Sequence, residues 1–214
     1  MWKKELGEWI KTIVIALLIA FLVRSYLFQP YKVQMGSMQP TLRNNDLIMV
    51  NKMIYRFRDP QRGDIVVFNP PGNTSAIHYI KRIVGVPGDK VEVSEGRVFI
   101  NGIELIEDYL QRENTPGQVG PLLLNEDEYF VLGDHRGNSM DSRDFGAISR
   151  DQIHGKTLFV LWPLKDFQVF GQVKYDLLEK DESLQEKHDN KVDDLPIEPI
   201  DEQFMENEPM APTE

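Results

Sequence analysis

The sequence predicts an all-β domain, preceded by one N-terminal transmembrane helix and followed by an acidic tail. From residue 31 to about residue 170, short runs rich in β-branched residues alternate with Gly, Pro, Asn and Asp, which is typical of strands joined by turns. Helical periodicity is hard to find outside a single apolar run near the N-terminus. No internal repeat of the lengths typical of solenoids or propellers is visible.

The composition limits the kinds of protein that the chain can be. Its 214 residues suffice for one sizeable domain with extensions, and the absence of cysteine excludes a disulfide framework, thiolate catalysis and a Cys-ligated zinc site. The formal charge of -10 arises at one end, since the residues from Lys174 onward hold 14 acids and 4 lysines, whereas residues 1–173 hold 20 acids and 20 bases. No concentrated basic surface is expected, so nucleic acid is not a predicted partner.

The N-terminal apolar run is interpreted as a membrane anchor. The uncharged stretch 12–23 would span only about 18 Å as a helix, short of a hydrocarbon core of about 30 Å. Extending it to residues 9–28 gives 20 residues, with basic and aromatic side chains near both ends that suit the interface of a lipid bilayer. A cleaved signal peptide is the alternative, but no small-x-small cleavage site follows Val23.

The anchor also predicts a topology. Lys3, Lys4 and Lys11 favour a cytoplasmic N-terminus. We therefore expect a single-pass protein whose β domain lies on the extracytoplasmic face of the cell membrane.

The predicted β domain covers residues 29–172. Turn signals at 62–64, 70–72, 87–89 and 101–102 separate its strands. The polar, Pro- and Gly-containing segment 107–125 is interpreted as a long loop or inserted arm, and the acidic residues 173–214 are expected to be a disordered tail. The predicted strands are Tyr31–Met35, Asp46–Lys52, Asp64–Asn69, His78–Val86, Lys90–Ser94, Arg97–Ile100, Tyr129–Leu132 and Lys156–Trp162.

Ser37, in the stretch GSMQPTL, is a candidate nucleophile. Gly36 permits a sharp turn or a close approach to a substrate, Pro40 fixes the backbone beyond it, and Met38 offers an adaptable apolar contact. A serine hydroxyl also needs a base and a donor for the oxyanion that its attack creates. Because a Gly-Ser pair before a proline is more often an ordinary turn, the assignment depends on finding a partner.

Lys81 is the candidate base. In the run HYIKRIVGV, strand alternation places Lys81 on one face with Tyr79 and Ile83. If that face is buried, desolvation lowers the lysine pKa, and a neutral amine can accept the proton of Ser37. A lysine that guards an exposed edge strand against aggregation fits the same pattern. The local pattern leaves both interpretations open.

A third polar stretch, GDHRGNSMDSRDFG at 133–146, combines carboxylates, arginines, serines and a histidine. Its carboxylates lack the spacing of a calcium loop and its arginines would repel a cation, so no metal site is predicted. A Ser/His/Asp triad that uses His135 or His78 is compatible with the chain order. A tight loop of paired Asp and Arg side chains is the more common structure, and such a loop can also line an active site.

Taken together, these stretches resemble the type I signal peptidases, membrane-anchored serine proteases that remove signal peptides from exported preproteins. The resemblance runs in order through SMQPTL at 37–42, RGDIVVF at 62–68, YIKRIVGVPGD at 79–89 and GDHRGNSMDSRDFG at 133–146. It implies an antiparallel, barrel-like β-sheet domain, a Ser/Lys dyad without a cofactor, and cleavage after small-x-small motifs. It favours the buried interpretation of Lys81 and gives His78 and His135 no catalytic role.

By this similarity Ser37 is the nucleophile, Lys81 is the general base, and Ser139 matches the serine that orients the lysine amine. The other matched positions are contacts beside the nucleophile and two structural ion pairs. The contacts are Met35, Gly36 and Met38, and the ion pairs are Arg82 with Asp134 and Asp141 with Arg143.

Met35 departs from the family pattern. Many members have a serine two residues before the nucleophile, and its hydroxyl joins the nucleophile's backbone N–H in the oxyanion hole, whereas a methionine side chain cannot donate a hydrogen bond. Losing one such donor can cost about 3 kcal/mol unless another group substitutes. We therefore expect Met35→Ser to leave the enzyme active or to improve it. Gly137, where an acidic residue is common, is a milder departure.

The predicted site lies close to the predicted anchor. Ser37 follows Phe28 by nine residues, and such a link reaches at most about 30 Å, so we expect the site near the outer membrane face. Two other classes remain: a Ser/Lys protease related to the self-cleaving repressors, and a non-catalytic membrane-tethered β module. The absence of a DNA-binding helical domain opposes the first, and the presence of both Ser37 and Lys81 opposes the second.

Overall fold

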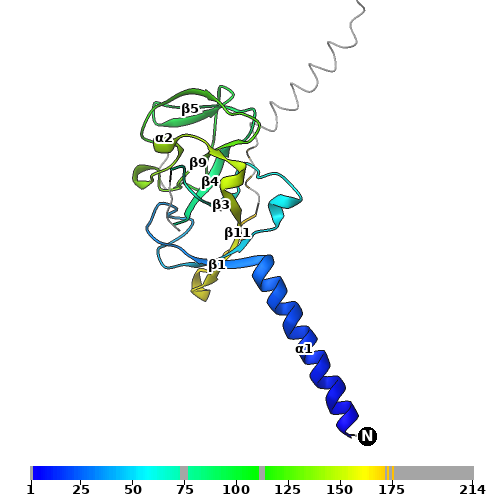
Figure 1. The fold of residues 1–214 in the computed structure, drawn as a ribbon. Helices are drawn as coiled ribbons and strands as arrows, with labels where there is room; N and C mark the ends of the chain where they lie inside the picture. The colour runs from blue at the N-terminus through cyan, green and yellow to red at the C-terminus, as the bar shows by residue number, and fades with distance from the viewer. Residues whose placement is uncertain (1, 73–76, 111–113, 172, 174, 176–214) are drawn as a thin grey trace, which may run out of the picture. The chain divides into compact units, whose positions relative to one another are not determined.

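The computed structural model describes residues 2–72, 77–110, 114–171, 173 and 175, and Figure 1 traces their fold. The chain divides into two units, Met1–Leu177 and Leu178–Glu214, and the second lies outside the described residues. The helices are α1 (Trp2–Tyr26) and α2 (Ser142–Phe145), with 3-10 turns η1 (Ile54–Arg56), η2 (Arg136–Asn138), η3 (Arg150–Gln152) and η4 (Leu164–Asp166). The strands are β1 (Phe28–Lys32), β2 (Leu47–Asn51), β3 (Ile65–Phe68), β4 (Tyr79–Gly85), β5 (Lys90–Ser94), β6 (Arg97–Ile100), β7 (Ile103–Glu104), β8 (Val119–Leu123), β9 (Glu128–Leu132), β10 (Ile148–Ser149) and β11 (Ile153–Trp162).

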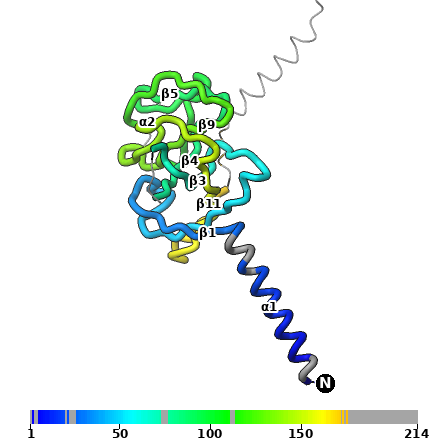
Figure 2. The backbone as a smooth tube through the Cα atoms, viewed as in Figure 1, coloured from blue at the N-terminus to red at the C-terminus, as the bar shows by residue number. Residues whose placement is uncertain are grey.

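The larger sheet has seven strands in the order β1-β2-β11-β3-β4-β9-β10. Each of its strand pairs is antiparallel, which confirms the predicted all-β, antiparallel class. The tube in Figure 2 shows the last strand, β11, returning to the early strands, and the register places it between β2 and β3. This insertion makes β3 an interior strand, paired with β11 and β4. Strand β4 is also interior, because it pairs with β3 on one side and with β9 on the other.

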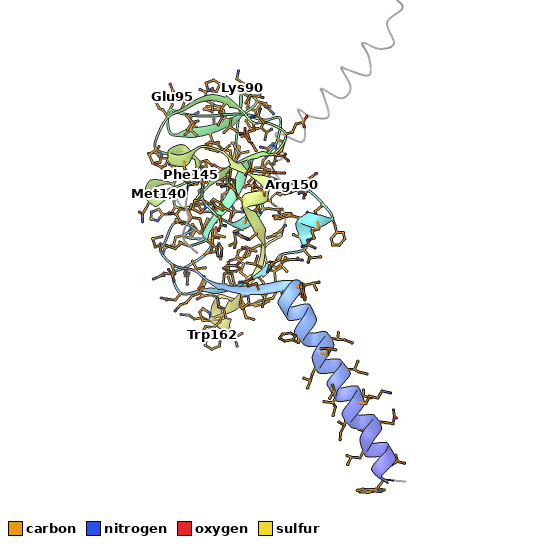
Figure 3. All side chains as sticks on the ribbon, in the orientation of Figure 1. Lys90, Glu95, Met140, Phe145, Arg150 and Trp162 are labelled. Atoms are coloured by element: carbon orange, nitrogen blue, oxygen red, sulfur yellow. The ribbon has the colours of Figure 1, made fainter. Side chains whose placement is uncertain are left out.

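The smaller sheet has four antiparallel strands in the order β7-β6-β5-β8. The predicted Asn101–Gly102 turn joins β6 to β7, with both residues at positive φ (55° and 83°), as a tight hairpin requires. Figure 3 labels Lys90 and Glu95, which belong to β5 and to the turn after it.

Segment 107–125 was expected to be a long loop or an inserted arm, and the loop interpretation does not hold for residues 119–123, which form β8. This strand pairs with β5 through Lys90–Leu123 and Val91–Leu122. Pro121 is tolerated there because β8 is an edge strand, where a missing N–H costs no ladder hydrogen bond. The glycine and proline that suggested a loop therefore mark an edge strand. Residues 111–113 of the segment lie outside the described residues.

Strand β3 is buried on both faces and joins the two apolar cores of the larger sheet. Ile65 and Val67 contribute to one cluster, and Val66 and Phe68 to the other, as period-two alternation requires. The first cluster comprises Val33, Met38, Leu42, Ile48, Val50, Ile65, Val67 and Val160. The second comprises Tyr55, Val66, Phe68, Ile83, Tyr129, Val131 and Ile148.

The N-terminal segment is a helix, but its boundaries differ from the predicted 9–28. Helix α1 begins at Trp2 and ends at Tyr26, and Phe28 opens β1 by pairing with Asn51. Strand β1 ends at Lys32, so the predicted strand 31–35 is also displaced toward the N-terminus. Met35, at φ 69°, is incompatible with a strand. In the part of the chain that the structure describes, no helix meets the length and hydropathy needed to cross a membrane.

The folded body extends past the predicted boundary at residue 172. Tyr175 is 8% exposed, and its hydroxyl lies 3.2 Å from that of Tyr109. Val173 lies against Gly63, where an added Cβ would be 3.0 Å from the valine Cβ. The predicted tail 173–214 therefore begins too early. Its remaining residues, 176–214, lie outside the described residues.

Candidate active site

The structure brings Ser37 and Lys81 together. Lys81 Nζ lies 2.8 Å from Ser37 Oγ, although the residues are 44 positions apart. Ser37 belongs to the turn-rich segment between β1 and β2, and Lys81 is in the middle of β4. The hydroxyl therefore has the nearby amine that the sequence argument required of a base.

Lys81 is buried because β4 is an interior strand. It pairs in register with Val66 of β3, and its side chain is on the face shared by Tyr79 and Ile83, as strand alternation predicts. The residue is only 4% exposed, and its Nζ lies 5.4 Å from the centroid of the Tyr79 ring. The interpretation of Lys81 as an edge-strand lysine is therefore wrong.

Burial changes the ionisation of Lys81. Desolvation is the largest influence and lowers its pKa from 10.5 to about 8. The carboxylates of Asp141 and Asp134 oppose this shift by favouring the ammonium, and Arg143 favours the neutral amine. The net result is an amine that is partly neutral near pH 8.

The residues that flank Ser37 have different environments. Met38 is 2% exposed and packs in the first apolar cluster, so it anchors the segment to the core. Met35 is 70% exposed and has a positive φ, a backbone conformation that residues other than Gly, Asn and Asp rarely adopt. Gly36 and Ser37 lie between these two and are partly exposed. The segment is therefore fixed on one side of Ser37 and open to solvent on the other.

Gly133, directly after β9, allows Ser37 and Ser139 to approach the same point. An added Cβ at Gly133 would lie 2.5 Å from the Ser37 carbonyl oxygen and would overlap Ser139 Oγ. The backbone N–H of Gly133 donates to Asp141 Oδ2 over 3.0 Å. The GDHRGNSMDSRDFG loop thus meets the nucleophile segment through a position where only a glycine fits.

Ser139 is near the dyad but makes no hydrogen bond to it. Its Oγ is buried and has no hydrogen-bond partner within the described residues. The predicted hydrogen bond to the Lys81 amine is therefore absent. The Ser139 hydroxyl can still form one, because it can both donate and accept a hydrogen bond.

Both predicted ion pairs are formed, and both are bidentate. Arg82 donates from Nε and Nη2 to Asp134 over 2.9 and 2.7 Å, with 4% and 0% of the two side chains exposed. Arg143 donates from Nε and Nη2 to Asp141, each over 2.8 Å. Asp141 also caps α2 in a capping box with Asp144. The pairs lock the loop that carries Ser139.

The residues around Arg82 include contacts that the sequence did not indicate. The Tyr109 ring centroid lies 3.9 Å from the Arg82 guanidinium carbon. Thr41 donates its hydroxyl to Asp134. Tyr109 belongs to the segment interpreted as a loop, where no residue pattern points to a partner on β4.

Within the described residues, neither histidine weighed as a triad member forms a hydrogen bond with the Ser37 hydroxyl. His78 contacts Asn69 Oδ1 through its Nδ1, over 2.7 Å. His135 contacts the backbone instead, with its Nδ1 3.3 Å from the Gly36 carbonyl oxygen. A histidine-based triad therefore has no geometric support.

Comparison with known proteins shows which family the chain resembles. A signal peptidase I from Enterococcus faecalis V583 resembles the chain with a TM-score of 0.40 and 36% identity, over 45% of this chain and 95% of that chain. The family described as signal peptidase, peptidase S26, matches residues 6–162. Signal peptidase I P of Bacillus subtilis subsp. natto is 43% identical over 172 residues, 76% of this chain and 92% of the relative. Signal peptidase I T of Bacillus subtilis strain 168 is 42% identical over 171 residues, 75% of this chain and 88% of the relative. The chain therefore belongs to the signal peptidase family, peptidase S26, and is a serine peptidase.

Proposed function

We propose that this peptidase removes N-terminal signal peptides from exported preproteins, with Ser37 as the nucleophile and Lys81 as the general base. The observation that carries the proposal is the 2.8 Å contact between Ser37 Oγ and the buried Lys81 Nζ. Family membership supports the substrate class, since the relatives are themselves named signal peptidase I. Family membership also favours signal-peptide removal over the two alternatives, a protease related to the self-cleaving repressors and a non-catalytic module.

Acylation uses the neutral form of Lys81. Ser37 Oγ attacks the carbonyl carbon of the scissile peptide while its proton passes to Lys81 Nζ. The tetrahedral intermediate then collapses, and the new ammonium donates that proton to the leaving amine nitrogen. The signal peptide is left as an ester on Ser37, and the mature protein departs.

Deacylation repeats the proton transfers with water as the nucleophile. Lys81 takes a proton from the water as the water oxygen attacks the ester carbonyl, and returns it to Ser37 Oγ when the ester bond breaks. We assign Ser139 the task of orienting the lysine amine. Its buried Oγ has no other partner within the described residues and lies directly against Gly133, as Ser37 does.

Specificity for small residues requires bulky side chains beside the dyad. Tyr79 lies on the Lys81 face of β4, and its hydroxyl donates to Met140 Sδ over 3.7 Å. Met140 is 61% exposed and is labelled in Figure 3. We propose that these two side chains form one wall of the substrate site and exclude large side chains sterically, which suits cleavage after small-x-small motifs.

We further propose that α1 attaches the protein to a lipid bilayer, with the peptidase body on the extracytoplasmic side. The support is a set of large apolar side chains that α1 leaves exposed and that would be unfavourable in water. They are Trp9, Ile10, Ile13, Val14, Ile15, Leu17, Leu18, Ile19 and Phe21. Co-flotation of the full chain with vesicles, lost when residues 2–26 are deleted from a still folded protein, is the expected result. Equal flotation of both proteins would contradict this attachment.

The deciding experiment is cleavage of a purified preprotein by the detergent-solubilised full chain, with the N-termini of the products sequenced. We expect cleavage after a small-x-small motif, and its loss in Ser37→Ala, Lys81→Ala and Lys81→Arg, because arginine stays charged and cannot act as a base. Lys90→Arg is the matched control, since Lys90 is exposed on β5. Near-normal turnover by folded Lys81→Arg would rule out the proposed base, and an inactive folded wild type would rule out the function.

A further inference from the structure

The Gly36 carbonyl is held by donors from two distant parts of the chain. The Gln39 backbone N–H donates to this oxygen over 3.1 Å. His135 Nδ1 lies 3.3 Å from the same oxygen. Because a carbonyl oxygen can only accept, Nδ1 of His135 carries the hydrogen in this contact.

The same peptide unit carries the backbone N–H of Ser37. The bond between Gly36 and Ser37 is trans, so the C=O and N–H groups point in opposite directions within one plane. Fixing the direction of the Gly36 carbonyl therefore fixes the direction of the Ser37 N–H. Across residues 2–72, 77–110 and 114–171, this N–H donates to no acceptor, so it remains available for a substrate.

His135 also holds the opposite side of the nucleophile. Its backbone N–H donates to the Ser37 carbonyl oxygen over 3.0 Å. His135 is itself held, because its carbonyl accepts from the Asn138 N–H over 2.9 Å. It also follows Asp134, the buried partner of Arg82. One residue of the GDHRGNSMDSRDFG loop thus restrains the carbonyls on both sides of Ser37.

This restraint matters because Met35 supplies no side-chain donor. The oxyanion of the tetrahedral intermediate then depends on backbone donors, and a single donor stabilises charge only where it is already aimed. Met35 itself cannot provide rigidity, since its side chain is 70% exposed.

We propose that the His135 side chain is a positioning residue that aims the Ser37 N–H at the developing oxyanion and so offsets the missing donor at Met35. The imidazole does not touch the reacting atoms and acts through the Gly36–Ser37 peptide. The inference rests on the proposed Ser37/Lys81 mechanism and deepens it.

The test compares His135→Asn with His135→Leu in preprotein cleavage by the full chain. The amide nitrogen of asparagine can replace the Nδ1 donor, whereas leucine keeps bulk without a donor. We expect His135→Leu to lower kcat by about tenfold to a hundredfold, at or below the effect of deleting an oxyanion donor. KM should change little, and His135→Asn should restore most of kcat. His154→Leu is the matched control and should retain kcat, since the His154 ring packs on His78 and its Nε2 has no hydrogen-bond partner within the described residues.

A second measurement separates positioning from a general structural role. In a Met35→Ser background, the new hydroxyl supplies a second donor, so His135→Leu should cost less in kcat than it does beside Met35. Melting temperatures of all variants are recorded in parallel. Unchanged kcat in folded His135→Leu would overturn the inference, as would equal losses in the Leu and Asn variants or an equal penalty in both backgrounds. If wild type and Ser37→Ala are equally inactive, the proposed function fails instead.

Discussion

Lys81 Nζ lies 2.8 Å from Ser37 Oγ, and it makes this contact from a residue that is only 4% exposed. Burial alone would favour a neutral amine strongly, but two carboxylates near the lysine, those of Asp141 and Asp134, limit the fall of its pKa to about 8. The GDHRGNSMDSRDFG loop, which carries both carboxylates, therefore also influences the pH above which Lys81 is neutral and can act as a base.

The first prediction concerns pH. Only neutral Lys81 accepts the serine proton, and its pKa is about 8, so kcat/KM should rise roughly tenfold per pH unit below pH 8 and level off above it. The measurement is kcat/KM for one preprotein between about pH 6 and pH 10, because this parameter reports ionisations of the free enzyme. A flat profile across that range would show that a group other than a lysine with this pKa acts as the base.

Gly133→Ala should abolish cleavage. The new Cβ would lie 2.5 Å from the Ser37 carbonyl oxygen and would overlap Ser139 Oγ, so the nucleophile segment has to move. A displacement of about 1 Å at a reacting group can cost about a hundredfold in rate. Gly137→Ala is the matched control, since a Cβ at Gly137, in the same loop, meets no atom within 4 Å. Equal turnover by the two variants would mean that the loop adjusts without moving Ser37.

Arg82→Met should destabilise the fold far more than the loss of an exposed ion pair. Its partner Asp134 is fully buried, and removing the arginine leaves a carboxylate without its counter-charge, at a cost of about 3–5 kcal/mol in the free energy of unfolding. Arg97→Met breaks the Arg97–Glu104 pair, where 57% and 41% of the side chains are exposed, and should cost about 1 kcal/mol or less. Chemical denaturation of both variants tests the difference. Similar losses would mean that Asp134 finds another partner or takes up a proton.

The strands were predictable where one physical rule determines them. The interior strand β3 is a continuous apolar run, and the hairpin at Asn101–Gly102 has its turn residues in the sequence. Edge strand β8 was missed because a proline such as Pro121 argues against an interior strand but is acceptable in an edge strand. Whether a strand lies at an edge depends on the order of the whole sheet, which the local sequence does not give.

The site was predictable only in part for a related reason. Alternation places Lys81 beside Tyr79, but its burial depends on β9 and β3 pairing on both sides of β4, which no local pattern encodes. The contacts of His135 with the Gly36 and Ser37 carbonyls join residues about a hundred positions apart, and they involve backbone oxygens that every sequence has. Family motifs mark such residues without revealing what they touch.

The last prediction separates Tyr175 from the acidic residues that follow it. Its side chain is 8% exposed, and its hydroxyl lies 3.2 Å from that of Tyr109, whose ring covers Arg82. Burial raises the Tyr175 pKa to about 12, so the phenol stays neutral at physiological pH. Deleting residues 176–214 should leave preprotein cleavage and melting temperature unchanged, because none of these contacts is lost. Tyr175→Ala should instead lower the free energy of unfolding by about 3 kcal/mol or more, as expected when a large buried aromatic side chain is removed.

Two variants keep this test specific. Tyr175→Phe removes only the hydroxyl and should cost about 1 kcal/mol, the usual net worth of one hydrogen bond. Phe167→Ala removes an aromatic ring that is 57% exposed, so it should cost much less than Tyr175→Ala. If deletion of 176–214 abolished cleavage by a stably folded protein, the acidic residues would have a part in the reaction. If Tyr175→Ala and Phe167→Ala lowered the free energy of unfolding equally, the packing of Tyr175 on Tyr109 would contribute little to stability. The Arg82–Asp134 pair would then not depend on Tyr175.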